Sequence, residues 1–177
     1  MTRGSQGPDA VDLILSDWAA SRPSLDVSAL AVFGRLHRTF LKYQTAIVPT
    51  FEKHGINMSS FDVLAALRRH GPPYQMTAGE LATSSLVTTG GVTLRVDRLE
   101  EQGLVARERD TDDRRVVYIR LTPKGQQVVD EVADDHFANE LALLGTLGER
   151  DRASLARLLS RLEASITEAH TTRRDRA

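Results

Sequence analysis

Residues 76–125 read MTAGELATSSLVTTGGVTLRVDRLEEQGLVARERDTDDRRVVYIRLTPKG, and this stretch decides the fold. Two short helical patterns come first, at 77–83 and 88–102, with only a few residues between them. Two short strand patterns follow, and a charged loop separates them. This order predicts a helix-turn-helix followed by a β-hairpin wing.

The second helical pattern carries its own start and stop signals. Thr88 or Thr89 can cap its first turn, apolar residues recur at helical spacing, and Gly103 stands where a left-handed C-terminal residue is wanted. Small side chains occupy the outward positions near its N-terminus: Thr89, Gly90, Gly91 and Thr93. A helix tip that enters the major groove of DNA needs such side chains, because its backbone must approach the bases closely.

The predicted hairpin alternates between an apolar and a polar face. Val117, Ile119 and Leu121 fall on one face, and Tyr118 and Arg120 fall on the other. The loop at 109–115 holds several cations at its tip. We expect this tip to reach a neighbouring minor groove or phosphate.

These motifs carry a resemblance to a known family. The run ARERDTDDRRVVYIRLTPKG at 106–125 resembles the wing of the MarR (multiple-antibiotic-resistance regulator) family, and LRVDRLEEQGLV at 94–105 resembles the end of that family's recognition helix. The resemblance extends over roughly residues 9–170 and implies a homodimeric DNA-binding regulator. A narrower resemblance links the chain to the urate-responsive branch of the family, which has an extra N-terminal helix.

The resemblance also assigns roles in the wing. Arg115 is similar in position to the family's arginine that enters the minor groove, and Asp113 is expected to brace it by a charge-assisted hydrogen bond. Arg107, Arg109 and Arg114 are expected to contact phosphates or to form ion pairs within the hairpin. The alternative for this cluster is an ordinary solvated turn of mixed charge.

Further DNA contacts are expected from the helix-turn-helix. The base- or phosphate-facing positions of the second helix are Thr88, Thr89, Gly90, Gly91 and Thr93, with Arg98 as a phosphate contact. Threonine can touch either a base or a phosphate, so these residues define no base code. Ser84 and Ser85 in the turn can donate to phosphate, or can serve only in capping and turn formation.

Five further helices are predicted outside this stretch, at 9–20, 26–53, 59–70, 123–144 and 149–170. Pro49 should kink or shorten the second of them, and Ser59 with Asp62 resembles a capping box at the start of the third. Thr122 and Pro123 should cap and open the fourth.

The predicted fold class is therefore mainly α with a small β-hairpin wing, a winged helix-turn-helix flanked by N- and C-terminal dimerisation helices. Residues 1–8 should be disordered, 9–57 should form N-terminal helices for dimerisation and possible ligand contact, and 58–122 should bind DNA. Residues 123–170 should form C-terminal dimerisation helices, with a flexible tail at 171–177. Long amphipathic helices need a partner for their apolar stripes, which favours a homodimer over a monomeric bundle.

Resemblance to the urate-responsive branch implies four ligand-binding residues: Trp18, Asp62, Arg69 and Arg95. Indole offers a stacking face, arginine a cationic fork, and Asp62 an acceptor that a bound anion would repel. Each also has a structural interpretation. Trp18 can simply pack its helix against the body of the protein. Asp62 near a helix N-terminus and Arg69 near a helix C-terminus are each favoured by the helix dipole, and Arg95 can face DNA or an acidic neighbour.

Composition excludes several classes of function. The chain has 177 residues, 41% of them hydrophobic, which suffices for one domain with a core. The absence of cysteine excludes disulfides, thiolate metal sites and thiol switches. We expect a cytoplasmic, nucleoid-associated protein, because no apolar run is long enough to span a membrane and no signal-peptide core is present.

No cofactor, metal site or enzymatic activity is expected. The sequence has no Gly-rich phosphate loop, nucleophile elbow or HExxH motif, and its five histidines lack the short spacing of a metal site. Histidines that converge at a dimer interface are the alternative left open. Cations and acids balance within 76–125, so the expectation of DNA binding rests on the motif more than on charge.

The predicted function is that of a ligand-responsive repressor that binds a pseudo-palindromic operator as a homodimer, with a small anionic ligand such as urate or a related aromatic or carboxylate metabolite. Two other classes remain open. A non-sensing architectural protein would bind DNA with little sequence preference, and a helical protein-interaction module would bind none.

Overall fold

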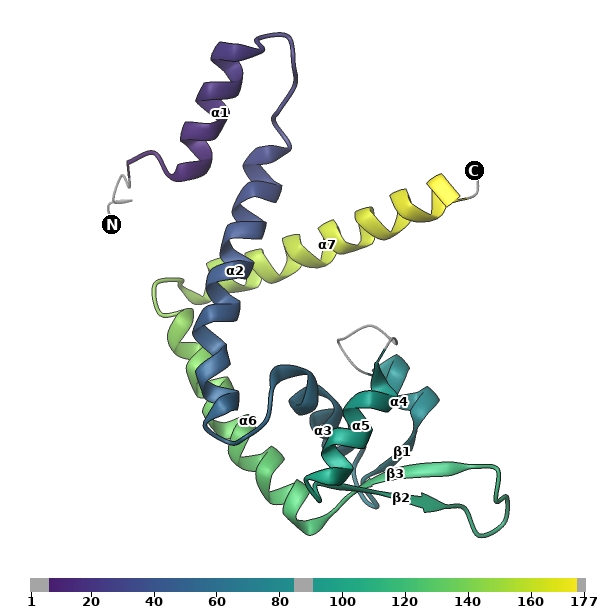
Figure 1. The fold of residues 1–177 in the computed structure, drawn as a ribbon. Helices are drawn as coiled ribbons and strands as arrows, with labels where there is room; N and C mark the ends of the chain where they lie inside the picture. Colours follow the sequence, from purple (N-terminus) through teal and green to yellow (C-terminus); the bar gives the residue numbers. More distant parts are fainter. Residues whose placement is uncertain (1–6, 85–90, 175–177) are drawn as a thin grey trace.

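The computed structural model describes residues 7–84 and 91–174 (Figure 1). Its elements in chain order are α1 (Ala10–Ser21), α2 (Leu30–Glu52), α3 (Met58–His70), β1 (Gln75–Thr77), α4 (Ala78–Ser84), α5 (Val92–Glu101), β2 (Val105–Arg109), β3 (Val117–Leu121), α6 (Pro123–Leu143) and α7 (Glu149–Arg174). The predicted mainly α fold with a β-hairpin wing is confirmed. Within the described ranges, no helix combines the length and apolar character needed to cross a membrane.

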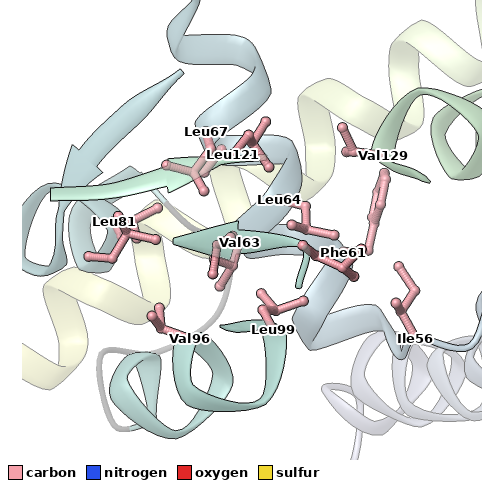
Figure 2. Close-up of a cluster of buried hydrophobic side chains, with 14 of the residues drawn as sticks. Ile56, Phe61, Val63, Leu64, Leu67, Leu81, Val96, Leu99, Leu121 and Val129 are labelled. Atoms are coloured by element: carbon pink, nitrogen blue, oxygen red, sulfur yellow. The ribbon is translucent and has the colours of Figure 1, made fainter. Parts of the chain in front are cut away.

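The main core lies where α3 meets α5 and the sheet. Val63, Leu64 and Leu67 of α3 are fully buried, and they occupy one cluster with Val96 and Leu99 of α5 (Figure 2). Burying a valine or leucine side chain contributes about 1.5–3 kcal/mol relative to leaving it exposed. This core holds the recognition helix α5 against the body of the domain.

The sheet has three antiparallel strands in the order β1-β3-β2. Ile119 in the central strand β3 pairs with Met76 of β1 on one side and with Arg107 of β2 on the other. Strand β1 was not predicted from sequence. It has only three residues, too few for a periodic signal, and it forms because β3 offers it a free edge.

Helix α3 begins differently from the prediction. Asn57, not Ser59, caps it: its side chain accepts a hydrogen bond from the amide of Ser60 at 2.9 Å. The predicted capping box of Ser59 and Asp62 is therefore wrong. Both Asn57 and Ser59 are good capping residues, and only Asn57 has the extended backbone that a cap requires, with φ of −121° and ψ of 169°.

Helix α5 begins at Val92, later than the predicted start at residue 88. Gly91 is its N-cap, with φ of +121° and no capping bond from a side chain. The predicted caps Thr88 and Thr89 lie outside the described residues, and the prediction that Gly91 lies within the helix is wrong. Gly103 closes the helix as predicted, with φ of +69°, and the next amide bonds back to the carbonyl of Leu99 at 2.9 Å.

Helix α2 continues through Pro49 to Glu52, so the predicted shortening at the proline does not occur. Asn139 of α6 ties the two helices together at this turn. Its Nδ2 donates to the carbonyl of Ala46 at 3.2 Å and to Oγ1 of Thr50 at 3.1 Å. Pro49 has no amide hydrogen for the carbonyl of Thr45, so α2 loses one helical bond here, and the two bonds from Asn139 attach this turn to α6.

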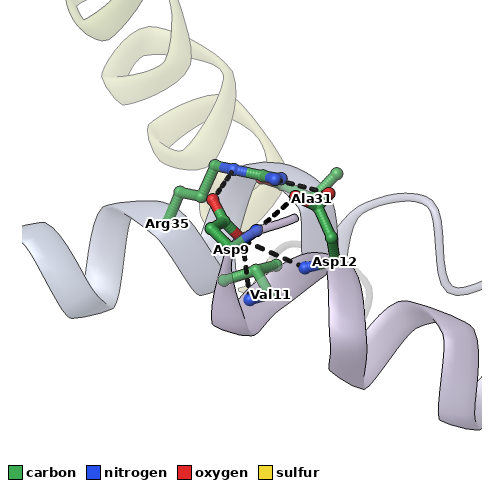
Figure 3. A network of polar contacts seen from close by, with 5 residues as sticks. All are labelled: Asp9, Val11, Asp12, Ala31 and Arg35. Carbon is green, nitrogen blue, oxygen red and sulfur yellow. Dashed lines mark hydrogen bonds and ion pairs between the residues drawn. The ribbon is translucent and has the colours of Figure 1, made fainter. Parts of the chain in front are cut away.

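Helix α1 packs against the N-terminal half of α2. Val11 is buried there, and Gly34 of α2 leaves room for it, because a Cβ on Gly34 would stand 3.1 Å from Cγ1 of Val11. Arg35 of α2 donates to Asp9 at 2.9 Å and to Asp12 at 2.7 Å (Figure 3). Asp9 caps α1 as well, so one cluster fixes both the start and the position of this helix.

Helix α7 extends away from the rest of the chain (Figure 1). It runs to Arg174, past the predicted end at residue 170, and none of its residues is buried. Large apolar side chains are exposed along α7 and on the helices near it: Phe33, Leu36 and Phe40 of α2, Phe137 and Leu141 of α6, and Leu155, Leu158, Leu159 and Ile166 of α7.

Candidate nucleic-acid interface and adjoining cleft

Arg115 and Asp113 form a braced pair at the tip of the wing. Nε of Arg115 donates to Oδ1 of Asp113 at 3.0 Å, and Nη2 donates to Oδ2 at 2.8 Å. These bonds lower the pKa of the Asp113 carboxyl, and they raise the pKa of the arginine. The side chain of Arg115 is still 91% exposed. The bracing bond predicted from sequence is therefore present, and it holds a cation in a defined direction at the tip.

Side-chain hydrogen bonds also shape the loop between β2 and β3. The carboxylate of Asp110 accepts from the amides of Asp112 and Asp113, each at 2.8 Å, and the carbonyl of Asp113 accepts from the amide of Val116 at 2.9 Å. Aspartate commonly folds the backbone this way in turns. Arg109, the last residue of β2, and Arg114, within the loop, are both exposed.

Arg107 joins the wing to the recognition helix. Its guanidinium donates to the carboxylates of Asp97 and Glu100, both on α5, and its amide donates to Glu100 at 3.1 Å. The bond to Asp97 is the main cause of its raised pKa. Of the two roles predicted for Arg107, the ion pair is made to α5 instead of within the hairpin, and the phosphate contact stays a prediction. The wing and α5 are thereby held as one unit.

The outward face of α5 carries small and cationic side chains. Gly91, Thr93 and Arg98 are exposed there, as is Leu94, which the sequence reasoning missed. Leu94 falls between the buried positions Val92 and Val96, and that spacing was the available signal. The predicted contacts Ser85, Thr88, Thr89 and Gly90 lie outside the described residues.

Ser84 and Arg95, two of the predicted site residues, contact other residues of this chain near α5. The carbonyl of Ser84, at the end of α4, accepts from Nη2 of Arg69 at 3.3 Å. The guanidinium of Arg95 folds back over the start of α5, 3.8 Å from where a Cβ on Gly91 would stand. Arg95 therefore covers the N-terminus of the recognition helix.

A cleft of about 550 Å³ opens between α2, α3 and α6. Its wall is mainly apolar and includes several aromatic side chains, and its polar lining includes both acids and bases. Residues that line it include Phe40, Tyr43, Phe51, Met58, Phe61, Asp62, Ala65, Arg68, Arg69, Asp130, His136, Phe137 and Glu140. A concave, largely apolar site with a few polar groups is the usual form of a small-molecule site.

Aromatic rings in tilted and edge-to-face contact lie along the wall of the cleft. The ring of Phe51 lies 5.4 Å from that of Phe61 and 5.0 Å from that of His136, between centroids. His136 also lies 5.3 Å from Phe61 and from Phe137. Tyr43 donates to Oε1 of Glu140 at 2.5 Å, and burial together with this bond raises the pKa of the tyrosine.

One chain brings together two of the four predicted ligand residues. Asp62, 8% exposed, and Arg69 both lie on α3 and line the cleft. Trp18 is 41% exposed on α1, at the far end of α2 from α3 (Figure 1), and Arg95 lies on α5. The lining residues on α2 and α6 were missed. His136 was noted in the sequence only as one of several scattered histidines.

Comparisons with known proteins agree with this architecture. Residues 56–117 match the MarR family. The chain is 35% identical over 153 residues to the HTH-type transcriptional regulator PecS of Dickeya dadantii, covering 86% of this chain and 92% of PecS. It is 33% identical over 127 residues to the HTH-type transcriptional repressor MdtR of Bacillus subtilis, covering 72% of this chain and 80% of MdtR.

A solved structure shows the same fold. Sco3205, a MarR family regulator from Streptomyces coelicolor in complex with DNA, superposes with a TM-score of 0.70 at 21% identity. The match covers 80% of this chain and 93% of Sco3205. By its similarity to PecS, its match to the family and its winged helix-turn-helix, this chain belongs to the MarR family of DNA-binding transcriptional regulators.

Proposed function

We propose that this regulator is a ligand-responsive repressor that binds a pseudo-palindromic operator as a homodimer. The observation that carries the proposal is the attachment of Arg107 to Asp97 and Glu100, because it makes the wing and the recognition helix one reading unit. Two such units related by a two-fold axis would meet half-sites about one helical turn apart. Repression is supported by the similarity to MdtR, which is named a repressor.

Within each unit, Arg115 enters the minor groove while α5 lies in the major groove. The exposed position of Arg115 and its brace by Asp113 support this role, since a held side chain loses less entropy on binding. Thr93 and Arg98 face DNA from α5, and Arg109 and Arg114 meet phosphates. As a DNA-bound regulator, the protein would reside in the cytoplasm with the nucleoid.

The homodimer buries the exposed apolar side chains of α2, α6 and α7. Helix α7 buries none of its residues within its own chain, and regulators of this family act as dimers. Leu158→Asp should therefore shift the protein toward monomer and weaken operator binding, whereas Ala164→Asp, on the opposite face by helical spacing, should do neither. Sedimentation velocity measures the shift from dimer to monomer, and an unchanged dimer for Leu158→Asp would refute the proposed dimer interface.

The cleft between α2, α3 and α6 binds the ligand, a small anion such as urate or a related aromatic or carboxylate metabolite. Arg69 lines the cleft and also donates to the carbonyl of Ser84 at the end of α4, the helix that precedes the recognition helix in the chain. An anion that captures Arg69 would compete with that bond and so favour another placement of the reading unit. Trp18 joins the site from the partner subunit, and Arg95 transmits the change within α5, as in the urate-responsive branch that the sequence resembles.

The testing experiment is equilibrium binding of the purified dimer to the DNA upstream of its own gene, against scrambled DNA, across a salt series. A specific regulator should prefer the first by roughly a thousandfold or more, with affinity that falls steeply as salt rises. Urate should then weaken the specific complex. Salt-sensitive binding without preference would favour the architectural alternative, and no binding at low salt would favour a protein-interaction module.

A further inference from the structure

His136 places an unsatisfied nitrogen at the wall of the cleft. The side chain is 9% exposed, it lines the cleft from α6, and its ring packs against Phe51, Phe61 and Phe137. Its Nδ1 is buried, and no hydrogen-bond partner for it occurs among residues 7–84 and 91–174. A buried polar atom without a partner is costly, so each one in a native protein requires an explanation, and a bound ligand that supplies the partner is one.

The neighbours of His136 favour one tautomer of the neutral ring. Nε2 faces Oε1 of Glu140 at 3.4 Å, and the same oxygen accepts from the hydroxyl of Tyr43. A carboxylate that only accepts favours the tautomer in which Nε2 carries hydrogen. Nδ1 then presents a lone pair, so what it lacks is a donor.

We propose that His136 is a specificity-determining residue of this cleft, and that its Nδ1 accepts a hydrogen bond from an O–H or N–H on the aromatic ring of the ligand. The proposal rests on the cleft being the ligand site. The aromatic side chains of the wall offer faces and edges against which a planar ring can pack, and Arg69 supplies a cation for an anionic group. The ligand class is therefore a planar aromatic anion that carries a ring donor, which includes urate, since its rings carry N–H groups.

A matched pair of probes isolates this hydrogen bond. The compounds 6-hydroxy-2-naphthoate and 6-fluoro-2-naphthoate have the same ring, the same carboxylate and nearly the same size, but only the first can donate from the ring. Titration calorimetry of each probe into the full-length dimer gives the ratio of their affinities. A buried neutral hydrogen bond should make the hydroxyl probe about three- to tenfold tighter.

Two variants assign the ratio to His136. His136→Phe keeps an aromatic ring against Phe51 and Phe61 and removes the acceptor, so the affinity ratio should fall to about one while the fluoro probe binds as before. His54→Phe is the matched control. His54 is a half-buried histidine whose acidic neighbours lie on α6: its nitrogens face Asp135 at 2.7 Å and Glu131 at 3.9 Å, and it is not among the residues that line the cleft. For His54→Phe, the ratio of the two probe affinities should match that of the unaltered protein.

The outcomes separate this inference from the proposed function. If both probes bind with equal affinity to the unaltered protein, or if His136→Phe keeps the ratio, the role of His136 is refuted while the cleft remains the ligand site. If neither probe nor urate binds, the ligand site itself is refuted. If the ratio is one and His136→Phe instead lowers the stability of the dimer, the partner subunit supplies the missing donor, and the inference fails.

Discussion

Gly125 occupies a position where even one added carbon has no room. It is the third residue of α6, it is buried, and its amide donates to Oγ1 of the capping residue Thr122 at 3.0 Å. A Cβ at this position would stand 1.9 Å from the carbonyl oxygen of Leu104 and 2.9 Å from its carbonyl carbon. Both sides of this contact are backbone, so no side-chain rotation relieves it. Gly125→Ala must move the start of α6 away from the chain that leads into β2.

The cost of that movement follows from the bonds it breaks. The carbonyl of Leu104 accepts from the amide of Thr122 at 3.1 Å, and the Thr122 hydroxyl donates its one proton between the carbonyls of Gly103 at 2.8 Å and Leu104 at 3.2 Å. Two lost hydrogen bonds cost about 0.5–1.5 kcal/mol each. Overpacking adds about 1–3 kcal/mol. Gly125→Ala should therefore lower the free energy of unfolding by about 2–6 kcal/mol.

Urea unfolding of the dimer at one fixed protein concentration measures this loss. With an m-value of roughly 2 kcal/mol/M, a loss of about 3 kcal/mol moves the midpoint by about 1.5 M. Gly79→Ala is the matched control, because Gly79 lies in α4 and a Cβ there meets nothing closer than 4.0 Å. That variant should be unchanged or up to about 1 kcal/mol more stable. If Gly125→Ala unfolds at the same urea concentration with the same m-value, the close contact does not exist in solution.

Three further predictions test the wing, the junction of α2 with α6, and the contacts of Asp135 with Lys53 and His54. Arg115→Ala should reduce the slope of log affinity for operator DNA against log salt by about one per protomer, measured by fluorescence anisotropy, and an unchanged slope would show that this side chain meets no phosphate or groove. Asn139→Ala should cost about 1 kcal/mol in urea unfolding through loss of its bonds to α2, and an unshifted midpoint would contradict their contribution. The pKa of Asp135 is lowered by its bonds to Lys53 and His54, so its stabilising effect is present above the ordinary aspartate value of 3.8 and is lost as pH falls through the lowered pKa. Asp135→Asn should therefore lose less stability over that range in an acid unfolding series, and an identical pH profile would refute this.

The parts of the fold that sequence predicted well carry local signals. Gly103 marks a left-handed helix end and Thr122 with Pro123 marks a helix start, and each works through backbone atoms a few residues away. Strand β1 has no such signal, because its existence depends on the edge of β3. The cap of α3 was assigned to Ser59 because two suitable residues stand close together, and only the backbone angles at Asn57 distinguish them.

The cleft was less predictable because its lining comes from distant parts of the chain. Tyr43 and Glu140 form one hydrogen bond although α2 and α6 are separated by the whole DNA-reading region. Neither residue belongs to a motif, and His136 has no informative spacing. The predicted set of Trp18, Asp62, Arg69 and Arg95 came from resemblance. A single chain gathers only the two of them that share α3.

Because α7 buries none of its residues within one chain, the amount of stable regulator should depend on how fast chains are made. A newly made chain holds this helix in water with its leucines exposed, and an isolated helix is only marginally stable there. In the proposed dimer, that helix is covered when a second chain arrives, so α7 should be more open to proteolysis in an unpaired chain than in a dimer. The rate of dimer formation then depends on the square of the chain concentration, since two chains must meet before either is protected. The level of active regulator would rise more steeply than the level of its messenger RNA.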